Sequence, residues 1–314
     1  MAPLSFWIGF HVVLLAFLAV DLGVFHRTPR EVGFLEAAIW NAVWIVVAMA
    51  FNTGVWIVLG RGPGLEFLTG YLIEHALSID NIFVFIVVFA FFGVPAAHQH
   101  RILFWGILGA LVFRGALIAA GAALLARFHW ITYVFGAFVL VTGVRFYFHR
   151  PGKMDVGRNP VLRLARRLLP VTEGYEGPEF LVKRAGRWAA TPLLLVLIVV
   201  ESVDVAFALD SIPAIFAVTH SPFIVYTSNV FAILGLRASY FLMAGLLPRI
   251  TYLSAGLATV LVFVGMKMLT EPWIAVSTGV SLLVVVLVLG VTVGASLLAP
   301  VRGSRAAGRS GDAR

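Results

Sequence analysis

One stretch of acidic and polar residues inside a long apolar segment constrains this chain more than any other feature. It runs from Glu74 to Ile82 and reads EHALSIDNI, and DVAFALDSI repeats its pattern from Asp204 to Ile212, 130 positions later. The shared pattern is an acid, five residues, Asp, then Asn or Ser, then Ile. An ionisable side chain at the centre of a membrane helix costs about 2.5 to 3.5 kcal/mol, so acids kept in such surroundings indicate a function.

The composition places the whole chain in a membrane. Of its 314 residues 61% are hydrophobic and 12% are charged, and the mean hydropathy is +0.99, far outside the range of soluble globular proteins. The absence of cysteine removes thiolate metal sites, disulfides and cysteine nucleophiles together. A net charge of +8 is compatible with nucleic-acid binding. Because the basic residues lie in loops between apolar segments, membrane topology explains them more simply, and no nucleic-acid partner is expected.

Apolar runs of about 20 residues predict an all-α polytopic membrane protein with about nine transmembrane helices. The first run has neither a basic start nor a small-residue cleavage site, so we interpret it as a helix and not as a signal peptide. The predicted spans cover residues 5–25, 34–60, 66–92, 101–126, 130–149, 191–218, 224–247, 250–270 and 273–299.

The distribution of basic residues predicts the orientation. With the N-terminus outside, 18 of the 23 Lys and Arg residues fall in loops on the inner side and 3 on the outer side. This asymmetry favours an inner (plasma) membrane protein with its N-terminus outside and its C-terminus in the cytoplasm. The remaining two, Arg114 and Arg237, lie inside spans.

This orientation makes the two motif spans antiparallel and so predicts an inverted-topology repeat of three helices, an architecture typical of transporters. WGILG at Trp105 and FAILG at Phe231 also match, as do Gly143-Val144-Arg145 and Gly265-Met266-Lys267. The predicted domains are two N-terminal helices (1–65), repeat 1 (66–149), a cytoplasmic basic loop (150–190), repeat 2 (191–270), a C-terminal helix (271–300) and a disordered cytoplasmic tail (301–314).

The 150–190 loop has two parts. Residues 159–170, bounded by two prolines, read as a short amphipathic basic helix. It either lies on anionic lipid or is an ordinary loop that obeys the charge rule. Residues 180–188 predict a small hairpin that turns at Ala185-Gly186.

The candidate metal ligands are five carboxylates well inside the third and sixth spans: Glu74, Asp80, Glu201, Asp204 and Asp210. Within each motif the two acids are six residues apart, about 9 Å along a helix and about 120° around it. Either the helices unwind, near Asp80-Asn81 and near Pro213, or the acids line successive positions on one path. The alternative for the whole set is a structural polar network, a costly way to achieve packing.

All other candidate metal-ligand atoms except one imidazole nitrogen are oxygens, which suit Mg, Ca or Mn better than Zn or Cu(I). Additional candidate ligands are Asn81, Ser211 and His75. His75 would favour Mn²⁺, but it is as well placed to face a neighbouring helix. We expect no permanently bound cofactor and a divalent metal, most simply Mn²⁺, as the transported substrate.

Arg114 and Arg237 lie at matching depth, thirteen residues into their spans. We interpret them as charge-balancing counter-ions of the acids; the alternative is that they replace the cation when the site is empty. Five acids exceed two arginines, so some carboxylates are expected to be protonated when no metal is bound. Metal binding would then release protons.

The chain resembles the TerC/Alx family of membrane proteins over nearly its whole length except the tail. The strings that carry the resemblance are DLGVFH (21–26), LEFLTGYLIE (65–74), LSIDNIFVF (77–85), QHR (99–101), FWGILG (104–109), DSIPAIFAVT (210–219), TSN (227–229) and LRA (236–238). The resemblance implies a multi-spanning inner-membrane protein, linked by name to tellurite resistance and by other members to manganese efflux. It also implies that the acids of both motif helices form the metal site, and all five are present.

Two functions follow as hypotheses. The first is a proton-coupled exporter of a divalent metal ion. The second is a membrane scaffold for metal delivery or for a tellurite or stress-resistance complex, with membrane or secretory partner proteins and no transport of its own. An intramembrane hydrolase is disfavoured, because no HExxH or GxSxG string occurs, so we expect no enzyme. Tellurite is an oxyanion that a carboxylate site would repel, so any tellurite phenotype would be indirect.

Overall fold

The structure is a computed structural model that describes residues 3–25, 33–128, 130–148, 156–175, 177–184, 186–246, 252–274 and 276–298. It is a mostly helical membrane protein, as predicted. Its elements are α1 (Leu4–Phe25), α2 (Phe34–Leu59), α3 (Arg61–Phe92), α4 (Ala96–Arg127), α5 (Ile131–Phe148), η1 (Val156–Arg158), α6 (Pro160–Leu168), β1 (Leu181–Arg184), β2 (Arg187–Ala190), α7 (Pro192–Phe216), α8 (Pro222–Leu234), α9 (Leu236–Leu246), α10 (Leu253–Thr270) and α11 (Thr278–Leu298).

Six helices of the described residues are long and apolar enough to cross a membrane: α2, α3, α4, α5, α7 and α11. Shorter apolar stretches occur in α1 (Leu4–Ala19) and α10 (Ala255–Thr270). The expected disordered tail, 301–314, lies outside the described residues.

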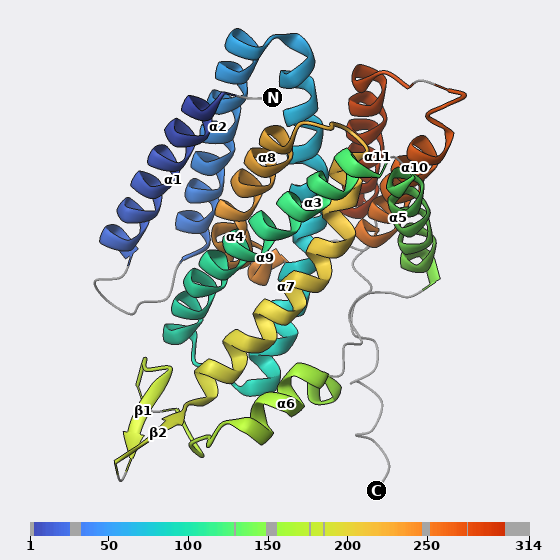
Figure 1. Ribbon diagram of the computed structural model, residues 1–314. Coiled ribbons are helices and arrows are strands. Elements are labelled where there is room, and N and C mark those ends of the chain that lie inside the picture. Colours follow the sequence, from blue (N-terminus) through green and yellow to red (C-terminus); the bar gives the residue numbers. More distant parts are fainter. Residues whose placement is uncertain are drawn as a thin grey trace, which may run out of the picture.

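Four helices form the centre of the bundle, since α3 and α4 each contact both α7 and α8. The short helix α8 is buried along nearly its whole length, from Phe223 to Leu234. Figure 1 shows α1 and α2 on one side of this centre and α5, α10 and α11 on the other. The acid motifs, on α3 and α7, therefore lie in the interior of the bundle.

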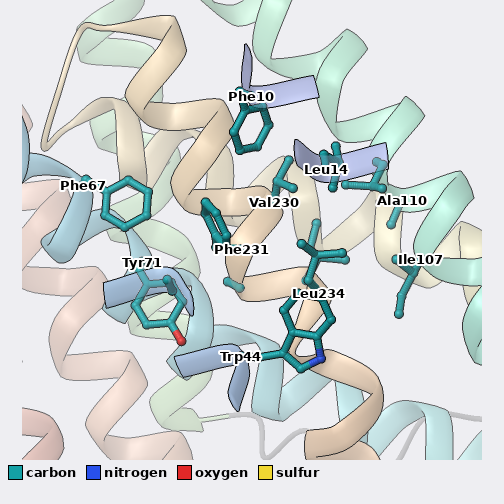
Figure 2. Close-up of a cluster of buried hydrophobic side chains, with 14 of the residues drawn as sticks. Phe10, Leu14, Trp44, Phe67, Tyr71, Ile107, Ala110, Val230, Phe231 and Leu234 are labelled. Carbon is teal, nitrogen blue, oxygen red and sulfur yellow. The ribbon is translucent and has the colours of Figure 1, made fainter. Parts of the chain in front are cut away.

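Aromatic side chains attach the first two helices to the centre. Figure 2 shows Phe10 of α1, Phe67 of α3 and Phe231 of α8 within one buried cluster. The Phe231 ring lies 5.9 Å from Phe10 and 4.8 Å from Phe51 of α2. Lipid is as apolar as these side chains, so their preference for one another comes from close packing and ring geometry.

The structure differs from one expectation about helix continuity and bears on one open alternative. The span predicted at 224–247 is interrupted at Gly235, where α8 ends and α9 begins, because glycine has no Cβ and holds a helical conformation weakly. The motif helices do not unwind at Asp80-Asn81 or at Pro213, since α3 and α7 continue through both places. Near its end α7 tolerates Pro213, whose missing N–H interrupts only its last turns.

Glycines bring α5 and α10 into close contact. A Cβ on Gly143 of α5 would lie 2.8 Å from the Val262 nitrogen, and a Cβ on Gly265 of α10 would lie 2.6 Å from the Leu140 nitrogen. Each glycine therefore faces the backbone of the other helix. The two backbones approach as closely as they do because neither glycine has a side chain.

The segment between α5 and α7 folds as the sequence predicts. Asn159 caps α6, and its side-chain oxygen accepts hydrogen bonds from the backbone nitrogens of Val161 (2.9 Å) and Leu162 (3.2 Å). Strands β1 and β2 form an antiparallel hairpin whose turn contains Gly186 at φ +80°; Ala185 lies outside the described residues. Tyr175 donates a hydrogen bond to the Phe92 carbonyl at the end of α3 (2.7 Å). Burial raises the pKa of Tyr175, so this donor keeps its proton at neutral pH.

Because α5 and α10 are in close contact, we expect two glycine substitutions to differ strongly in their effect on the free energy of unfolding. Gly265→Ala places a methyl group against the α5 backbone, so we expect the free energy of unfolding to fall by about 1 to 3 kcal/mol. Gly290→Ala is the control, because nothing lies within 4 Å of a Cβ at that position of α11; there we expect no loss. Unfolding of the purified protein in an SDS titration measures both. Equal stabilities would contradict the close approach.

Candidate functional site

Arg114 of α4 joins the two acid motifs. Its Nε donates to Asp204 Oδ2 at 3.1 Å and its Nη2 to Asp204 Oδ1 at 2.9 Å, while its Nη1 donates to Glu74. Nη1 also donates to Asn229 Oδ1 of α8 at 2.9 Å, and the Asn229 amide nitrogen donates to Glu74 Oε2 at 3.2 Å. One guanidinium thus connects residues from all four central helices.

These four side chains are almost completely removed from solvent. The exposed fraction is 2% for Arg114, 1% for Glu74, 3% for Asp204 and 1% for Asn229. A guanidinium suits this position, because its planar fork of five donors can satisfy two carboxylates and an amide at once. Buried charges are tolerated only when they are paired and hydrogen-bonded in this way. The contacts place Arg114 as a counter-ion at the level of the motifs.

A small cavity adjoins this ionic group. Its volume is about 10 Å³, and its walls include Glu74, Arg114, Asn81, Asp210 and Ser211. That is about the room needed by a single water-sized particle. Apart from the guanidinium of Arg114, these polar wall residues contribute oxygen ligands, the type that hard divalent cations prefer.

Two oxygens from this cavity's residues lack hydrogen-bond partners among the described residues: Asn81 Oδ1 and Ser211 Oγ. Both side chains are 2% exposed, and buried polar atoms are nearly always satisfied in native proteins. Asp210 accepts one hydrogen bond, from the Thr142 hydroxyl of α5 at 3.3 Å. The cavity thus adjoins two buried acceptors that nothing in the described part of the chain satisfies.

Glu201 lies outside the hydrogen-bonded group around Arg114. It is half-buried and its carboxylate packs directly against Gly109 of α4, where any Cβ would collide with it. Its Oε2 has no hydrogen-bond partner within the described part of the chain. This carboxylate lies close enough to Asp204, three residues later, for the two to repel each other, although Asp204 is the one that binds Arg114.

The remaining candidates are distributed around the site. His75 stacks on the Tyr71 ring at 5.5 Å, and its Nδ1 has no partner among the described side chains. Arg237 is buried and lines a second small cavity beside Asp204. The side chain of Asp80 lies outside the described residues. Among the residues described, no three His, Cys, Asp or Glu side chains form a metal-binding group.

Sequence reasoning missed three residues of this site. Asn229 binds both Arg114 and Glu74, Thr142 binds Asp210, and Gly109 makes room for Glu201. A signal existed for Asn229, because an amide in the apolar run of α8 is as unusual as an acid there. Thr142 and Gly109 belong to types that are ordinary in membrane helices, and only the packing of helices identifies them.

We expect Arg114 to stabilise the fold, because its positive charge offsets the buried negative charges of Glu74 and Asp204. Arg114→Gln leaves two buried carboxylates without a cation, so we expect a loss of about 3 to 5 kcal/mol in the free energy of unfolding. Adding Glu74→Gln and Asp204→Asn to the same chain should restore much of it. The control is Arg127→Gln, an exposed arginine on the same helix. SDS unfolding titrations measure all three variants, and equal effects at positions 114 and 127 would contradict this role.

Comparison with known proteins finds relatives that are named as membrane proteins. The chain is 51% identical over 292 residues to an uncharacterized membrane protein, STKORF319, of Myxococcus xanthus, an alignment that covers 93% of this chain and 92% of that one. It is 47% identical to Alx of Escherichia coli K12, named as a proposed membrane-bound redox modulator, with 87% and 89% covered. It is 38% identical to a membrane protein of Rickettsia felis, with 90% and 94% covered.

No solved structure was found to match the chain. Residues 59–304 match the model of the integral membrane protein TerC family. This match spans most of the chain and includes both acid motifs. The chain belongs to the integral membrane protein TerC family.

Proposed function

We propose that this protein exports a divalent metal cation, Mn²⁺ first among them, across the inner membrane in exchange for protons. The observation that carries the proposal is the small cavity between the motif helices, which adjoins two oxygens without partners among the described residues and lies beside the acid pair that Arg114 binds. A cation there would satisfy Asn81 Oδ1 and Ser211 Oγ and neutralise Asp210. In this proposal the N-terminus lies outside the cell and the C-terminus lies in the cytoplasm.

The small cavity favours Mn²⁺ over Mg²⁺, because an ion must lose most of its water to enter it. Mg²⁺ loses its water reluctantly and usually keeps several water ligands, whereas a space of about 10 Å³ holds one particle. Ca²⁺ takes six to eight oxygen ligands, and the two Glu74 oxygens of this cavity are already bound by Arg114 and Asn229. An ion that dehydrates more readily than Mg²⁺ and needs fewer ligands than Ca²⁺ suits the site better.

The arginines determine how the site is coupled to protons. Arg114 is held by three groups on three helices, so we assign it to permanent charge balance and not to a movable substitute for the cation. Asp210 is held more weakly, by the Thr142 hydroxyl and by the more distant charge of Arg145. Glu201 Oε2 has no hydrogen-bond partner among the described residues, and Asp80 belongs to the same motifs. These acids therefore carry protons when the metal is absent, and metal binding displaces them.

An inverted repeat accounts for contacts that the bundle makes twice. Contacts of α3 with α8 have a counterpart in those of α4 with α7. Gly143 and Gly265, which occupy matching positions of their repeats, contact Val262 and Leu140 respectively. Under the repeat, Leu140 corresponds to Val262, so the two contacts are reciprocal. Such a pseudo-two-fold arrangement places a substrate site between the halves, where Asn81 of one motif and Ser211 of the other lie.

The names of relatives suggest a connection with cellular redox state. This chain has no cysteine, so it offers no thiol for disulfide exchange. We propose that any redox effect follows from the metal concentration that the protein maintains.

The decisive variant is Asp210→Asn. The amide keeps the shape of the carboxylate but removes its charge, so we expect at least about a tenfold fall in Mn²⁺ flux, the change that a loss of 1.4 kcal/mol in cation binding would produce. Proteoliposomes with an internal Mn²⁺ dye and a pH dye measure metal and proton movement together. The double variant Asp80→Asn with Asp204→Asn tests one acid from each of the two motifs. Glu179→Gln, an exposed carboxylate distant from the motifs, is the matched control.

Two outcomes would contradict the transporter. If the wild-type protein binds Mn²⁺ without moving it, the scaffold for metal delivery becomes the better account. If Asp210→Asn transports as fast as the wild-type protein and the Glu179→Gln control, the cavity is the wrong site. Mg²⁺ flux as fast as Mn²⁺ flux would contradict the argument from cavity size.

Gly109→Ala tests the involvement of Glu201 without changing a charge. Its methyl group would displace the Glu201 carboxylate, and because Glu201 is half-buried the side chain has room to move. We expect Mn²⁺ flux to fall several-fold while the SDS unfolding midpoint changes little. Gly115→Ala, on the same helix, is the control, since a Cβ there would make only an ordinary contact at 3.4 Å with Tyr226. Equal Mn²⁺ flux in both variants would show that Glu201 takes no part in transport.

A further inference from the structure

The short helix α6 has three distinct faces. Leu162 and Ala165 are buried against the bundle. A second stripe is apolar but exposed: Val161 (38%), Leu164 (56%) and Leu168 (70%), at positions that share one side of a helix. The third face carries three basic residues, Arg163, Arg166 and Arg167, all exposed.

The bundle holds this helix in place. Leu162 and Ala165 belong to a core cluster with Val199 and Val203 of α7, and the Asn159 amide donates to the Ser202 hydroxyl of α7 at 3.2 Å. A free helix of nine residues is unstable in water, so these contacts fix which faces α6 presents. The packing of α6 on α7 therefore keeps the apolar stripe exposed at the surface. Figure 1 shows α6 at the same end of the bundle as β1 and β2.

A groove begins where α6 ends. It encloses about 640 Å³ and is lined by Arg166, Leu169, Phe91, Phe92 and Leu195, with Thr172 and Glu173 among its polar residues. Phe91 and Phe92 are the last residues of α3, and Leu195 lies in the first turn of α7. The groove is more polar than apolar at its surface, and it brings the Arg166 guanidinium together with the side chains of Phe91, Phe92 and Leu195 at the ends of two membrane helices.

We propose that α6 and this groove bind anionic phospholipids of the adjacent leaflet. The stripe formed by Val161, Leu164 and Leu168 would enter the boundary between headgroups and acyl chains, as amphipathic interfacial helices do. The three arginines would take the lipid phosphates, which guanidinium groups bind with two parallel hydrogen bonds. A single acyl chain would lie along Phe91 and Phe92.

Charge and position together select lipid as the occupant. Three arginines beside an apolar stripe complement an anionic leaflet, and each contributes about a fivefold preference for such a surface. The stripe belongs to a chain already embedded in the bilayer, so no loss of translational freedom opposes the contact. This proposal is independent of cation transport, because its test contains no flux measurement.

The absence of cysteine makes the test direct, since one introduced cysteine carries the only label. A spin label at Leu168→Cys reports accessibility to oxygen, which is concentrated in lipid, and to a nickel chelate, which is confined to water. The full-length protein is placed in nanodiscs of phosphatidylcholine with or without phosphatidylglycerol. We expect the oxygen-to-nickel ratio at this position to rise several-fold when phosphatidylglycerol is present.

Two variants test whether lipid binding depends on the arginines of α6 or only on the net charge of this segment. Replacing Arg163, Arg166 and Arg167 with Gln should abolish the effect of phosphatidylglycerol on the label, and native mass spectrometry should show loss of phosphatidylglycerol enrichment on the protein. The control replaces Lys183, Arg184 and Arg187 of the β1–β2 hairpin with Gln, which removes the same charge from the same segment; both effects should persist. An unchanged SDS unfolding midpoint establishes that each variant is folded.

The proposal is overturned if the label is equally accessible to the nickel chelate in both bilayers. It is also overturned if the hairpin variant loses enrichment as fully as the α6 variant, because the contact would then depend on net charge alone. Inorganic phosphate added to phosphatidylcholine nanodiscs should not reproduce the shift. If it does, the site binds free phosphate and not a lipid headgroup.

Discussion

The buried contact of Arg114 with Glu74, Asp204 and Asn229 is the interaction on which the rest of this bundle depends. Inside a membrane, helices gain little from hiding apolar surface from one another, because the lipid is equally apolar. Close packing and polar contacts must therefore determine which helices meet. One guanidinium that satisfies groups on α3, α7 and α8 fixes the rotation of three helices about the fourth.

The other contacts of the bundle take their place around this centre. Aromatic rings near Phe231 hold α1 and α2 against α8, while glycines let α5 and α10 meet backbone to backbone. The acids then divide by partner. Glu74 and Asp204 share the charge of Arg114, whereas Asp210 lines the small cavity and Glu201 Oε2 has no hydrogen-bond partner among the described residues, and this division is what the proposed exchange of metal for protons requires.

Much of this arrangement could be predicted from the sequence, wherever a residue type is energetically unfavourable in its surroundings or typical of a helix end. Acids such as Glu74 and Asp204 stand out in apolar runs because burying them is expensive, and Asn159 before Pro160 is a recognisable helix start. The rotation of each helix left no such sign. Glu201 and Asp204 share a helix face, yet one packs on Gly109 and the other binds Arg114. The break at Gly235 was also missed, because glycines occur throughout these spans without interrupting them.

The crossing of α5 and α10 has a mechanical consequence. Where side chains interlock, two helices can turn past each other only by unlocking, but at Gly143 and Gly265 the contact surface is smooth backbone. The ionic group at Arg114, by contrast, resists displacement in every direction. A rigid-body movement of one half of the bundle against the other would therefore turn about the Arg114 contacts, which hold, while α5 and α10 slide past each other at the glycine crossing.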